Sequence, residues 1–400
     1  MRRIYLDNNA TTRVDPAVVE AMLPFFSDQF GNASSTHAFG ASVAGALKTA
    51  RKQLQALLGS AHDHEIVYTS GGTESNNTAI LSALEAQTDR DEIVTSAVEH
   101  PAILQLCQHL EKTGRAKVRY IGVDSLGRLD LDAYRAALSD KVAIVSIMWA
   151  NNETGTIFPV EGLADLAKGV GALFHTDAVQ AVGKTPMCLK DSAIDMLSLS
   201  GHKLHAPKGV GALYVKRGVR FKPLLRGGHQ ERGRRAGTEN VPGIVALGKA
   251  AELAIQHMAD EQSRVKDLRD RLEKAILQTV PNCFVNGDRH DRLPNTSNIA
   301  FEFVEGEAIL LHLTRAGVAA SSGSACTSGS IEPSHVLLAM DIPVTAVHGS
   351  IRFSLSRDNS VEDVNRVIEV MPAIIEKLRA LSPFGADAGK QDSDSNPLYA

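Results

Sequence analysis

The sequence predicts an α/β protein with two units: a large one on a mostly parallel sheet covered by helices on both faces, and a smaller α/β one. Three observations predict this fold class. Between about residues 60 and 220, short β-branched runs alternate with stretches of helical period. The run 142–150 is hydrophobic almost throughout, as in a strand buried on both sides. A long helical pattern, 243–280, then precedes a second series of strands and helices.

The large unit is expected to contain seven strands, each a short run rich in β-branched residues. These runs are 65–70, 92–96, 117–123, 142–150, 172–178, 195–200 and 209–216. Helical periodicity between several of them predicts helices over 75–86, 102–112 and 160–170. Because strand and helix alternate, the sheet should be mainly parallel and seven-stranded.

The smaller unit is expected to follow the long helical pattern. Its predicted elements are a strand (297–303), a helix (306–316), a loop of small residues (321–330), a strand (350–356) and a final helix (361–381). We expect the large domain to comprise residues 15–260 and the small domain residues 1–14 and 261–382. Residues 383–400 lack apolar spacing and predict a mobile tail.

Charge and composition exclude several classes of protein. The 400 residues carry 42 basic and 46 acidic side chains, a net charge of −4, which argues against a general nucleic-acid or anionic-membrane binder. The longest apolar run, 142–150, is too short to span a bilayer. The N-terminus reaches Asp7 before any apolar stretch develops, so no signal peptide is expected. The four cysteines are far apart and favour free thiols in a reducing cytoplasm.

Polar and small residues follow five of the expected strands. They are GGTES after 65–70, EHP after 92–96, NNETG after 142–150, DAVQ at 177–180 and SGHK after 195–200. Ligands of open parallel sheets bind at the carboxyl ends of the strands. These segments are therefore the expected site.

The first of them, with Gly72 and Thr73, predicts a phosphate site. Two glycines and a threonine at a helix start offer backbone N–H groups, a hydroxyl and a positive helix end. A tight turn with Thr73 as helix cap is the alternative. A dinucleotide or nucleoside triphosphate is not indicated, because neither a GxGxxG motif nor a P-loop lysine is present.

Lys203 and Asp177 are candidates for holding an aldehyde cofactor. Lys203 follows a strand among Ser200 and His202, and a lysine beside a phosphate site can bond covalently to an aldehyde. Asp177 ends a strand among apolar neighbours, where the protonated nitrogen of a pyridine ring is a natural partner. Gln180 could donate to a phenolic oxygen of the same ring. A solvated lysine and a helix-capping aspartate are the alternatives.

Three further positions are candidates for a catalytic or binding role. His100, between a strand and Pro101, could stack on a flat ring or move a proton; a loop histidine without a role is the alternative. Cys326 lies among serines, glycines and alanines and should be accessible, with an incidental thiol as the alternative. The basic segment 226–235 is superficially like an RNA-binding RGG segment. It could instead supply a phosphate contact near Thr238 across a subunit interface.

Together these segments resemble one family. The sequence is similar to the pyridoxal-phosphate-dependent cysteine desulfurases of the class-V aminotransferase family, and most to the nitrogen-fixation type. The resemblance extends from IYLDNNATT (4–12) through WANNETGT (149–156), HTDAVQAVGK (175–184), SLSGHKLHAPKGVG (198–211), RGGHQERGRRAGTEN (226–240) and SSGSACTSGS (321–330) to RFSLSR (352–357). It implies an aminotransferase-like fold (pyridoxal-phosphate fold type I) and a homodimer with its active sites near the subunit interface.

The resemblance also implies a role for each matching residue. Lys203 would be the Schiff-base lysine, Asp177 the partner of the ring nitrogen and His100 the stacking and proton-transfer residue. Cys326 would be the nucleophile and, transiently, an iron–sulfur ligand shared with a scaffold protein. The other cofactor contacts would be Gly72, Thr73, Asn152, Gln180, Ser200, Gly201, His202 and, from the partner subunit, Thr238. Asn152 and Arg352 would face the substrate, with the guanidinium gripping a carboxylate.

The implied reaction converts L-cysteine to L-alanine and leaves a persulfide on Cys326. Its sulfur would supply iron–sulfur assembly through a scaffold protein, for nitrogenase. A selenocysteine lyase, another enzyme of the same cofactor class and a non-catalytic iron–sulfur scaffold remain as alternatives. The last has poor cluster geometry, because its other cysteines, Cys107, Cys188 and Cys283, are well separated.

Overall fold

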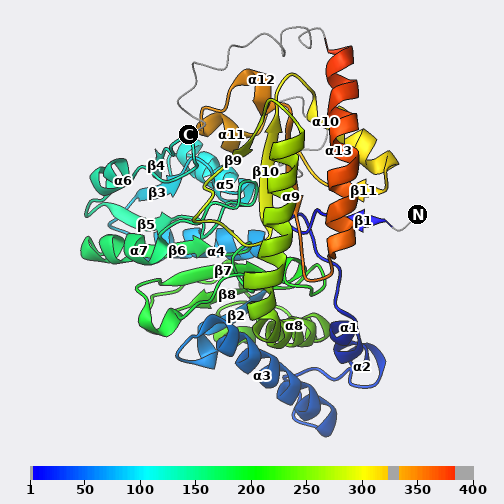
Figure 1. Cartoon of the computed structure of the whole chain (residues 1–400). Coiled ribbons are helices and arrows are strands. Elements are labelled where there is room, and N and C mark those ends of the chain that lie inside the picture. Colours follow the sequence, from blue (N-terminus) through cyan, green and yellow to red (C-terminus); the bar gives the residue numbers. More distant parts are fainter. Residues whose placement is uncertain (1–2, 323–332, 383–400) are drawn as a thin grey trace.

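A sheet of seven strands forms the centre of the larger part of the molecule (Figure 1). The computed structural model describes residues 3–322 and 333–382. The strands are β2 (Ile66–Thr69), β3 (Glu92–Ser96), β4 (Lys117–Ile121), β5 (Val142–Ser146), β6 (Leu173–Asp177), β7 (Met196–Ser200) and β8 (Gly211–Val215). All seven predicted strands are confirmed. The runs 117–123 and 142–150 form shorter strands than expected, ending at Ile121 and Ser146.

The sheet has the order β2-β8-β7-β6-β5-β3-β4. Neighbouring strands are parallel except at β8, which is antiparallel to both β2 and β7. The predicted, mainly parallel sheet is therefore confirmed. The carboxyl ends of β3, β5, β6 and β7 consequently lie at the same edge, where the chain leaves the sheet towards the segments that carry the predicted site residues.

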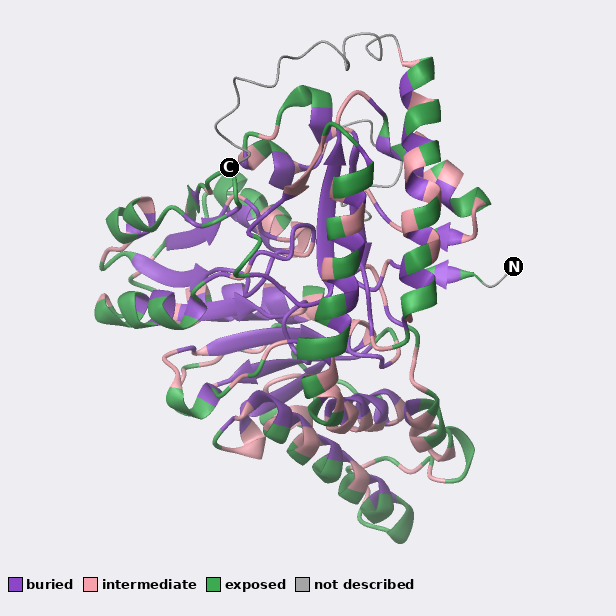
Figure 2. Cartoon of the chain, in the orientation of Figure 1, coloured by how far each residue is buried: buried purple, intermediate pink, exposed green. Residues whose placement is uncertain are grey.

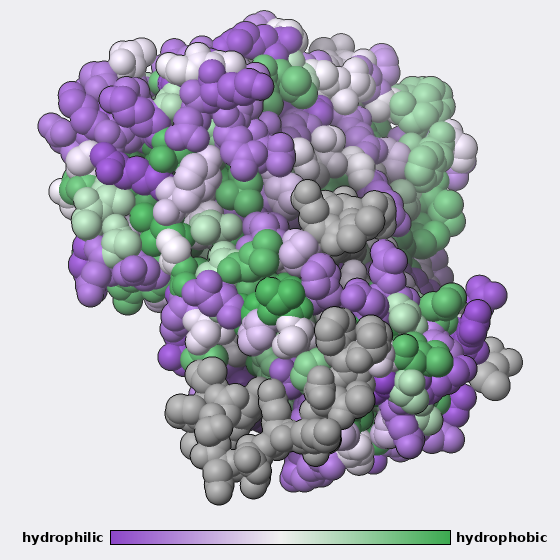
Figure 3. All heavy atoms as spheres, turned by 90° about the horizontal axis from the view of Figure 1, so that it is seen from above, coloured by the Kyte–Doolittle hydropathy of each residue, from purple (hydrophilic) through white to green (hydrophobic). Residues whose placement is uncertain are grey.

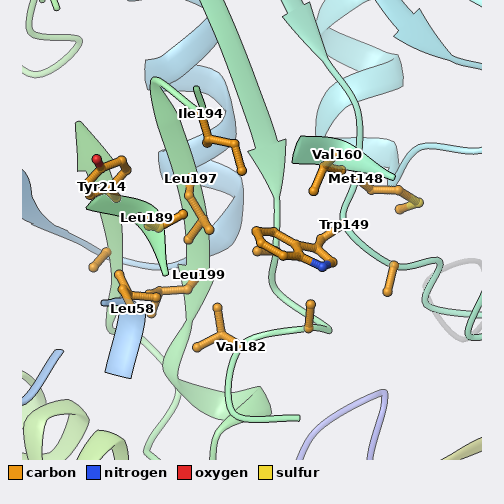
Figure 4. Close-up of a cluster of buried hydrophobic side chains, with 14 of the residues drawn as sticks. Leu58, Met148, Trp149, Val160, Val182, Leu189, Ile194, Leu197, Leu199 and Tyr214 are labelled. Atoms are coloured by element: carbon orange, nitrogen blue, oxygen red, sulfur yellow. The ribbon is translucent and has the colours of Figure 1, made fainter. Parts of the chain in front are cut away.

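Helices cover both faces of this sheet. Successive side chains of each strand point to opposite faces, so each buried strand contributes apolar side chains to both. Val94 packs on one face with α3 (Ala38–Leu58), α7 (Val160–Gly169) and α8 (Val241–Asp260). Its neighbour Ile93 packs on the other face with α4 (Gly72–Ala86) and α5 (Pro101–Lys112). Figure 2 shows the strands buried between partly exposed helices, and Figure 4 shows part of the first core around Trp149, Leu197 and Tyr214.

A second, smaller sheet and its own core form the rest of the molecule. Strand β10 (Thr296–Phe301) pairs antiparallel with β9 (Cys283–Asn286) and β12 (Ser350–Ser354), while β1 (Ile4–Tyr5) pairs parallel with β11 (Val318–Ala319). Helices α9 (Lys266–Thr279), α10 (Gly306–Arg315) and α13 (Val361–Leu381) pack into the same core. The remaining α-helices are α1 (Pro16–Met22), α2 (Pro24–Ser27), α6 (Leu131–Ala137), α11 (His335–Ala339) and α12 (Val344–Val347).

The long helical pattern 243–280 is three segments rather than one uniform helix. Helix α8 continues into a π-helical segment, Glu261–Val265, and then into α9. Ala254 of α8 packs in the large core, whereas Val265 begins the apolar face that packs in the small core. A π turn adds a residue to the helical repeat and so rotates the apolar face from one core to the other. Figure 1 shows α8 beneath the large sheet and α9 rising beside β10.

We propose a border between the two domains at residues 260 and 261, with residues 1–14 belonging to the small domain. Ile4 and Leu6 pack in the small core, which supports this division. Helix α11 is an exception, since Val336 and Leu337 pack in the core of the large sheet. Of the other predictions, the tail 383–400 and most of the loop 321–330 lie outside the described residues. No helix within residues 3–322 and 333–382 is both long and apolar enough to cross a membrane.

Candidate functional site

A cavity opens at the carboxyl edge of the large sheet, with an empty volume of about 940 Å³ including its mouth. Of the predicted site residues that the structure describes, all line it except Gly201 and Thr238. The lining residues are Asn9, Ala10, Gly72, Thr73, Asn76, His100, Met148, Ala150, Asn152, Asp177, Val179, Gln180, Ser200, His202, Lys203 and Arg352.

Lys203 is held inside the cavity rather than in bulk water. It ends a short 3-10 turn, Gly201–Lys203, that follows β7 directly. Its Nζ donates to the carbonyl oxygen of Ala10 at 2.7 Å and to that of Asn9. Two carbonyl groups of the N-terminal segment therefore orient the amine towards the space that Asp177 also lines.

Asp177 is a buried carboxylate with two hydrogen-bond donors. It ends β6 and is 6% exposed. Its Oδ1 accepts the backbone N–H of Val179 at 3.0 Å, and its Oδ2 accepts the side-chain amide of Asn76 at 2.6 Å. Each oxygen has a further lone pair, so the carboxylate can also accept from a cationic N–H in the cavity.

An anion-binding site lies where β2 is followed by α4, in the lining of the same cavity as the carboxylate of Asp177. Gly72 and Thr73 begin the helix, whose first N–H groups and positive dipole end favour an anion. A Cβ on Gly72 would lie 2.9 Å from a methyl of Val179, so glycine is needed there. Ser200 and His202 complete this part of the wall. These donors and this geometry fit the predicted phosphate site.

His202 and His100 are both buried enough to favour the neutral imidazole. Burial, together with the nearby positive charge of Lys203, lowers the pKa of His202 to about 4. Burial also lowers the pKa of His100, against the opposing effect of Asp177. The Nδ1 atom of His100 accepts the N–H of Ala102 at 3.1 Å and so caps α5. The proton of a neutral His100 ring is therefore on Nε2.

Arg352 is a buried arginine at the seam between the two domains. It lies on β12 and is 2% exposed. Its Nη1 donates to the carbonyl oxygen of Asn152 at 2.8 Å, and its Nη2 pairs with Asp7 at 2.8 Å. Both Arg352 and Asn152 line the cavity, as predicted for a carboxylate-binding pair.

Two described residues of the predicted site, Gly201 and Thr238, do not line the cavity, and Cys326 cannot be placed. Gly201 is buried behind Ser200, where a Cβ would lie 3.0 Å from Val210. Thr238 is exposed and lies outside this chain's own cavity. Cys326 lies outside the described residues, so its predicted roles as nucleophile and iron–sulfur ligand stay predictions. Among the described side chains no group of three or more His, Cys, Asp or Glu residues could hold a metal ion.

Sequence reasoning missed several lining residues. Asn9 and Ala10 act through backbone carbonyls, which leave no signal in side-chain type. Met148 and Ala150 belong to the run expected as strand, which leaves the sheet at Ser146. Asn76 could have been found, because it lies one helical turn after Gly72 and Thr73 and so faces the same way.

The cavity also holds polar atoms that call for a ligand. Gln180 donates through Nε2 to the carbonyl of Asn9 at 2.9 Å, while its Oε1 is buried with no partner among the described residues. Asn76 Oδ1 is in the same condition. Buried polar atoms are normally satisfied. An anion site, a carboxylate, an amine and unsatisfied amides in one cavity fit pyridoxal 5′-phosphate, which carries a phosphate, a basic ring nitrogen, an aldehyde and a hydroxyl.

Comparison with known proteins decides the family. Residues 4–367 match the family model described as aminotransferase class-V. The chain belongs to the class-V aminotransferase family. It is 71% identical over 400 residues to a cysteine desulfurase of Gluconacetobacter diazotrophicus, with both chains covered completely. It is 62% identical over 402 residues to "Cysteine desulfurase NifS" of Azotobacter vinelandii, again over the whole of both chains.

Solved structures agree with this membership. A structure described as "NIFS-LIKE PROTEIN" superposes with a TM-score of 0.88 at 35% identity, covering 94% of this chain and 100% of the other. "SspA in complex with cysteine" gives a TM-score of 0.78 at 35% identity, with 88% and 98% covered. The predicted aminotransferase-like fold and the resemblance to cysteine desulfurases are thus confirmed. Within the class-V aminotransferase family, the chain belongs with the cysteine desulfurases, which are pyridoxal-phosphate-dependent enzymes.

Proposed function

We propose that this protein takes the sulfur of L-cysteine onto Cys326, releases L-alanine and passes the sulfur on to iron–sulfur cluster assembly. The observation that carries the proposal is one cavity lined by an amine, a buried carboxylate and a buried guanidinium, those of Lys203, Asp177 and Arg352. Membership of the cysteine desulfurase group supports L-cysteine as the substrate, and so does the similarity to SspA, whose solved structure is a complex with cysteine.

Pyridoxal 5′-phosphate, when bound, supplies an electron-withdrawing ring that makes the substrate's α-proton acidic. In the proposed site Gly72, Thr73, Ser200 and His202 hold its phosphate, with Gly201 behind them. Asp177 keeps its ring nitrogen protonated, and Gln180 meets its hydroxyl. His100 lies against the ring. The Nζ of Lys203 would hold the aldehyde of this group and would act as the base for the proton on the substrate's α-carbon.

Arg352 and Asn152 orient the substrate. A guanidinium presents two parallel N–H groups to a carboxylate, and burial makes that pairing stronger than it would be in water. Asp7 and the Asn152 carbonyl already fix the guanidinium plane. Substrate therefore meets a guanidinium whose orientation is already fixed.

The sulfur step proposed for Cys326 balances without an external oxidant. The Cys326 thiolate forms a bond to the substrate sulfur, the bond from that sulfur to the substrate's β-carbon breaks, and the electron pair stays on the carbon. One proton added to that β-carbon, and the return of a proton to the α-carbon from Lys203, complete L-alanine, while Cys326 carries the persulfide. Described residues at both sides of the loop support this role: Ser321 pairs with Arg352 through backbone hydrogen bonds of 2.7 and 3.3 Å. On the other side, Ser334 donates to the buried carboxylate of Glu153 at 2.6 Å.

The chain length from this anchor to Cys326 is compatible with attack in the cavity. Cys326 is five residues after Ser321, and an extended chain spans at most about 3.6 Å per residue. Five extended residues span up to about 18 Å from Ser321, which pairs with Arg352. This length allows the thiol of Cys326 to reach a substrate bound at Arg352.

We also propose that the enzyme is a homodimer. Leu23, Phe26, Phe30 and Phe39 around α2 and the start of α3 are 56–68% exposed, and the rings of Phe30 and Phe39 are 5.6 Å apart. Clustered exposed aromatic side chains are unusual on a monomer. The exposed Thr238 lies outside its own cavity, which supports a contact with the cofactor phosphate of the partner subunit.

The proposed destination of the sulfur is an iron–sulfur scaffold protein that serves nitrogenase. Support comes from the relatives' names, because the Azotobacter vinelandii protein is called NifS. We propose the cytoplasm as the compartment: Cys107, Cys188 and Cys283 are free thiols, and Cys188 is exposed, as suits reducing surroundings.

Mass spectrometry after incubation with L-cysteine tests the sulfur step. We expect one added sulfur atom on the peptide that contains Cys326, together with an equal amount of L-alanine. Cys326→Ala should abolish both the adduct and sulfide release, whereas Cys188→Ala, which removes another accessible thiol, should leave them unchanged. Added sulfur on Cys188 alone, or a Cys326→Ala variant with full sulfide release from L-cysteine, would contradict the proposal and favour another enzyme of this cofactor class.

A further inference from the structure

Asn76 has a place in the site that no proposed cofactor or substrate contact explains. It lies on the first turns of α4 and is 1% exposed, although it lines the cavity. Its Nδ2 donates to Asp177 Oδ2 at 2.6 Å, a short bond of the charge-assisted kind. The nearest turn of the same helix carries Gly72 and Thr73, so one element meets both ends of the proposed cofactor.

The orientation of the Asn76 amide is fixed by chemistry. A carboxylate can only accept hydrogen bonds, so the amide nitrogen must face Asp177 and the amide oxygen must point elsewhere. That oxygen, Oδ1, is buried without a partner among the described residues. An unsatisfied buried acceptor is unfavourable. The hydrogen bond to Asp177 is the contact that the Asn76 side-chain amide makes within the described residues.

Asp177 is thereby held from two sides. Val179 N–H, 3.0 Å from Oδ1, belongs to the turn after β6, whereas Asn76 belongs to a helix on the other side of the sheet edge. Two donors, one on each oxygen, fix both the rotation and the tilt of the carboxylate plane. The lone pair that remains on each oxygen then has a fixed direction.

We propose that Asn76 is a positioning residue, which aligns Asp177 with the ring nitrogen of the bound cofactor. This inference rests on the proposed role of Asp177. Without the amide donor, Oδ2 would be a buried anionic oxygen with no donor of its own. Such a carboxylate would be free to rotate about its side-chain bonds. It would then be a weaker partner for a pyridinium N–H, because the hydrogen bond depends on alignment.

Cofactor binding to the apo-enzyme provides a test that does not depend on activity. The two probes are pyridoxal 5′-phosphate and its analogue with a carbon atom in place of the ring nitrogen. Only the first can pair with Asp177, so the ratio of the two dissociation constants measures that pairing. For the unsubstituted enzyme we expect a preference of about tenfold to hundredfold for the nitrogen-containing ring.

In Asn76→Ala the preference should fall to within about threefold, while the affinity for the carbon analogue changes less than about twofold. Asn76→Leu, which keeps the buried volume without the donor, should behave alike and provides a second variant if the alanine protein does not fold. Asn77→Ala is the matched control. Asn77 is the next residue of the same helix and donates to the carbonyls of Thr73 and Ala102, but not to Asp177. It should keep the full preference.

The outcomes separate this inference from the proposal beneath it. If the unsubstituted enzyme binds both rings equally well, the role of Asp177 is wrong and the inference falls with it. If that enzyme prefers the nitrogen ring and both Asn76 variants keep the preference, only the positioning role is overturned. Equal weakening of both probes would also overturn it, because it would show a role in general structure alone.

Discussion

At the scale of single residues, burial decides which groups beneath the site carry charge. His175 is fully buried between Ser146 and Ser198, whose hydroxyls lie 2.9 and 2.8 Å from its two ring nitrogens. Burial lowers the pKa of His175 to about 3, so the ring is neutral at pH 7. Because these residues lie on β5, β6 and β7, an uncharged bridge joins three strands just below Asp177.

Glu99, beside His100, shows the same effect for a carboxyl group. It is completely buried, and burial, helped by Asp177, raises its pKa to about 8 despite hydrogen bonds from Ser96 Oγ and Met148 N. The carboxyl group is therefore largely protonated at neutral pH. It supports the cavity wall at Met148 without adding a negative charge next to Asp177.

Glu99→Gln should change how the stability of the fold depends on pH. The folded pKa of Glu99 lies above its ordinary value near 4.5, so the folded state keeps a proton that the unfolded chain loses. The stability of the unsubstituted protein should therefore fall, relative to that of Glu99→Gln, as the pH rises from about 5 to 8. The slope is at most about 1.4 kcal/mol per pH unit. Urea unfolding at several pH values measures it.

Glutamine preserves the acceptor oxygen for Ser96 and Met148, which makes this comparison specific to the proton. The exposed Glu111 on α5 provides a control. The stability of Glu111→Gln should depend on pH in the same way as that of the unsubstituted protein. A stability difference between the Glu99→Gln and unsubstituted proteins that is constant from pH 5 to 8 would show that Glu99 is ionised in the fold.

At the scale of elements, the proposed phosphate site depends on how closely β8 approaches the turn before α4. Gly211, the first residue of β8, pairs with Thr69 at the end of β2. A Cβ on Gly211 would lie 2.6 Å from the carbonyl oxygen of Leu199 and 2.7 Å from the Cα of Gly71. Both are backbone atoms, so neither can move aside as a flexible side chain would. The antiparallel strand therefore helps to place the turn with Gly72 and Thr73.

Gly211→Ala should consequently weaken both the fold and cofactor binding. Overpacking against backbone costs typically about 1–3 kcal/mol, and the strain here falls on the turn that holds the phosphate. Thermal unfolding and titration of the apo-protein with pyridoxal 5′-phosphate measure the two effects. Gly45→Ala is the control: Gly45 is exposed within α3 and has free space around it, so alanine should stabilise by about 0.5–1 kcal/mol. Unchanged cofactor affinity in Gly211→Ala would show that β8 does not set the turn.

At the scale of the whole molecule, the site lies where two separate cores meet across a polar seam. Asn9 donates to the carbonyl of Asn152 at 3.2 Å, so the N-terminal segment of the small domain is tied to the loop after β5. Asn298 donates to the carbonyl of Glu153 at 3.2 Å, across to the loop after β5. Buried amides fix one register between the domains, because each must find its particular partner. The cavity can thus combine Lys203 of one domain with Arg352 of the other.

The proposed dimer predicts a change of oligomeric state in Phe30→Glu. The variant should be a monomer at concentrations where the unsubstituted protein is a dimer, since a buried carboxylate in an apolar interface is unfavourable. Sedimentation at several concentrations measures this. Figure 2 colours much of α1, α2 and the start of α3 as exposed.

A second exposed hydrophobic residue provides the control for this variant. Val344, 78% exposed on α12, belongs to the other domain, and Val344→Glu should leave the oligomeric state as it was. Figure 3, a view from above, shows hydrophobic side chains mixed with hydrophilic ones on that face. An unsubstituted protein that is monomeric at all concentrations would disprove the dimer.

The sequence alone determined the seven strands of the large sheet, because hydrophobic runs and their turn residues are local signals. It also identified Lys203, Asp177, His100 and Gly72 as candidates. These polar and small residues follow predicted parallel strands, and the carboxyl ends of such strands lie at one edge of the sheet. It could not locate β9 or β11, short strands that exist only through their partners, nor the break at 261–265, where two cores compete for one helix.

Only the tertiary structure decided what surrounds these residues. The carbonyls that hold Lys203 belong to Asn9 and Ala10, nearly two hundred residues away in the chain, and the donor that orients Asp177 is Asn76, from a helix that covers the sheet. Protonation followed in the same way, since the pKa values of Glu99 and His175 are set mainly by burial. Hydrogen bonding and desolvation depend on neighbours in space, and a linear pattern does not contain them.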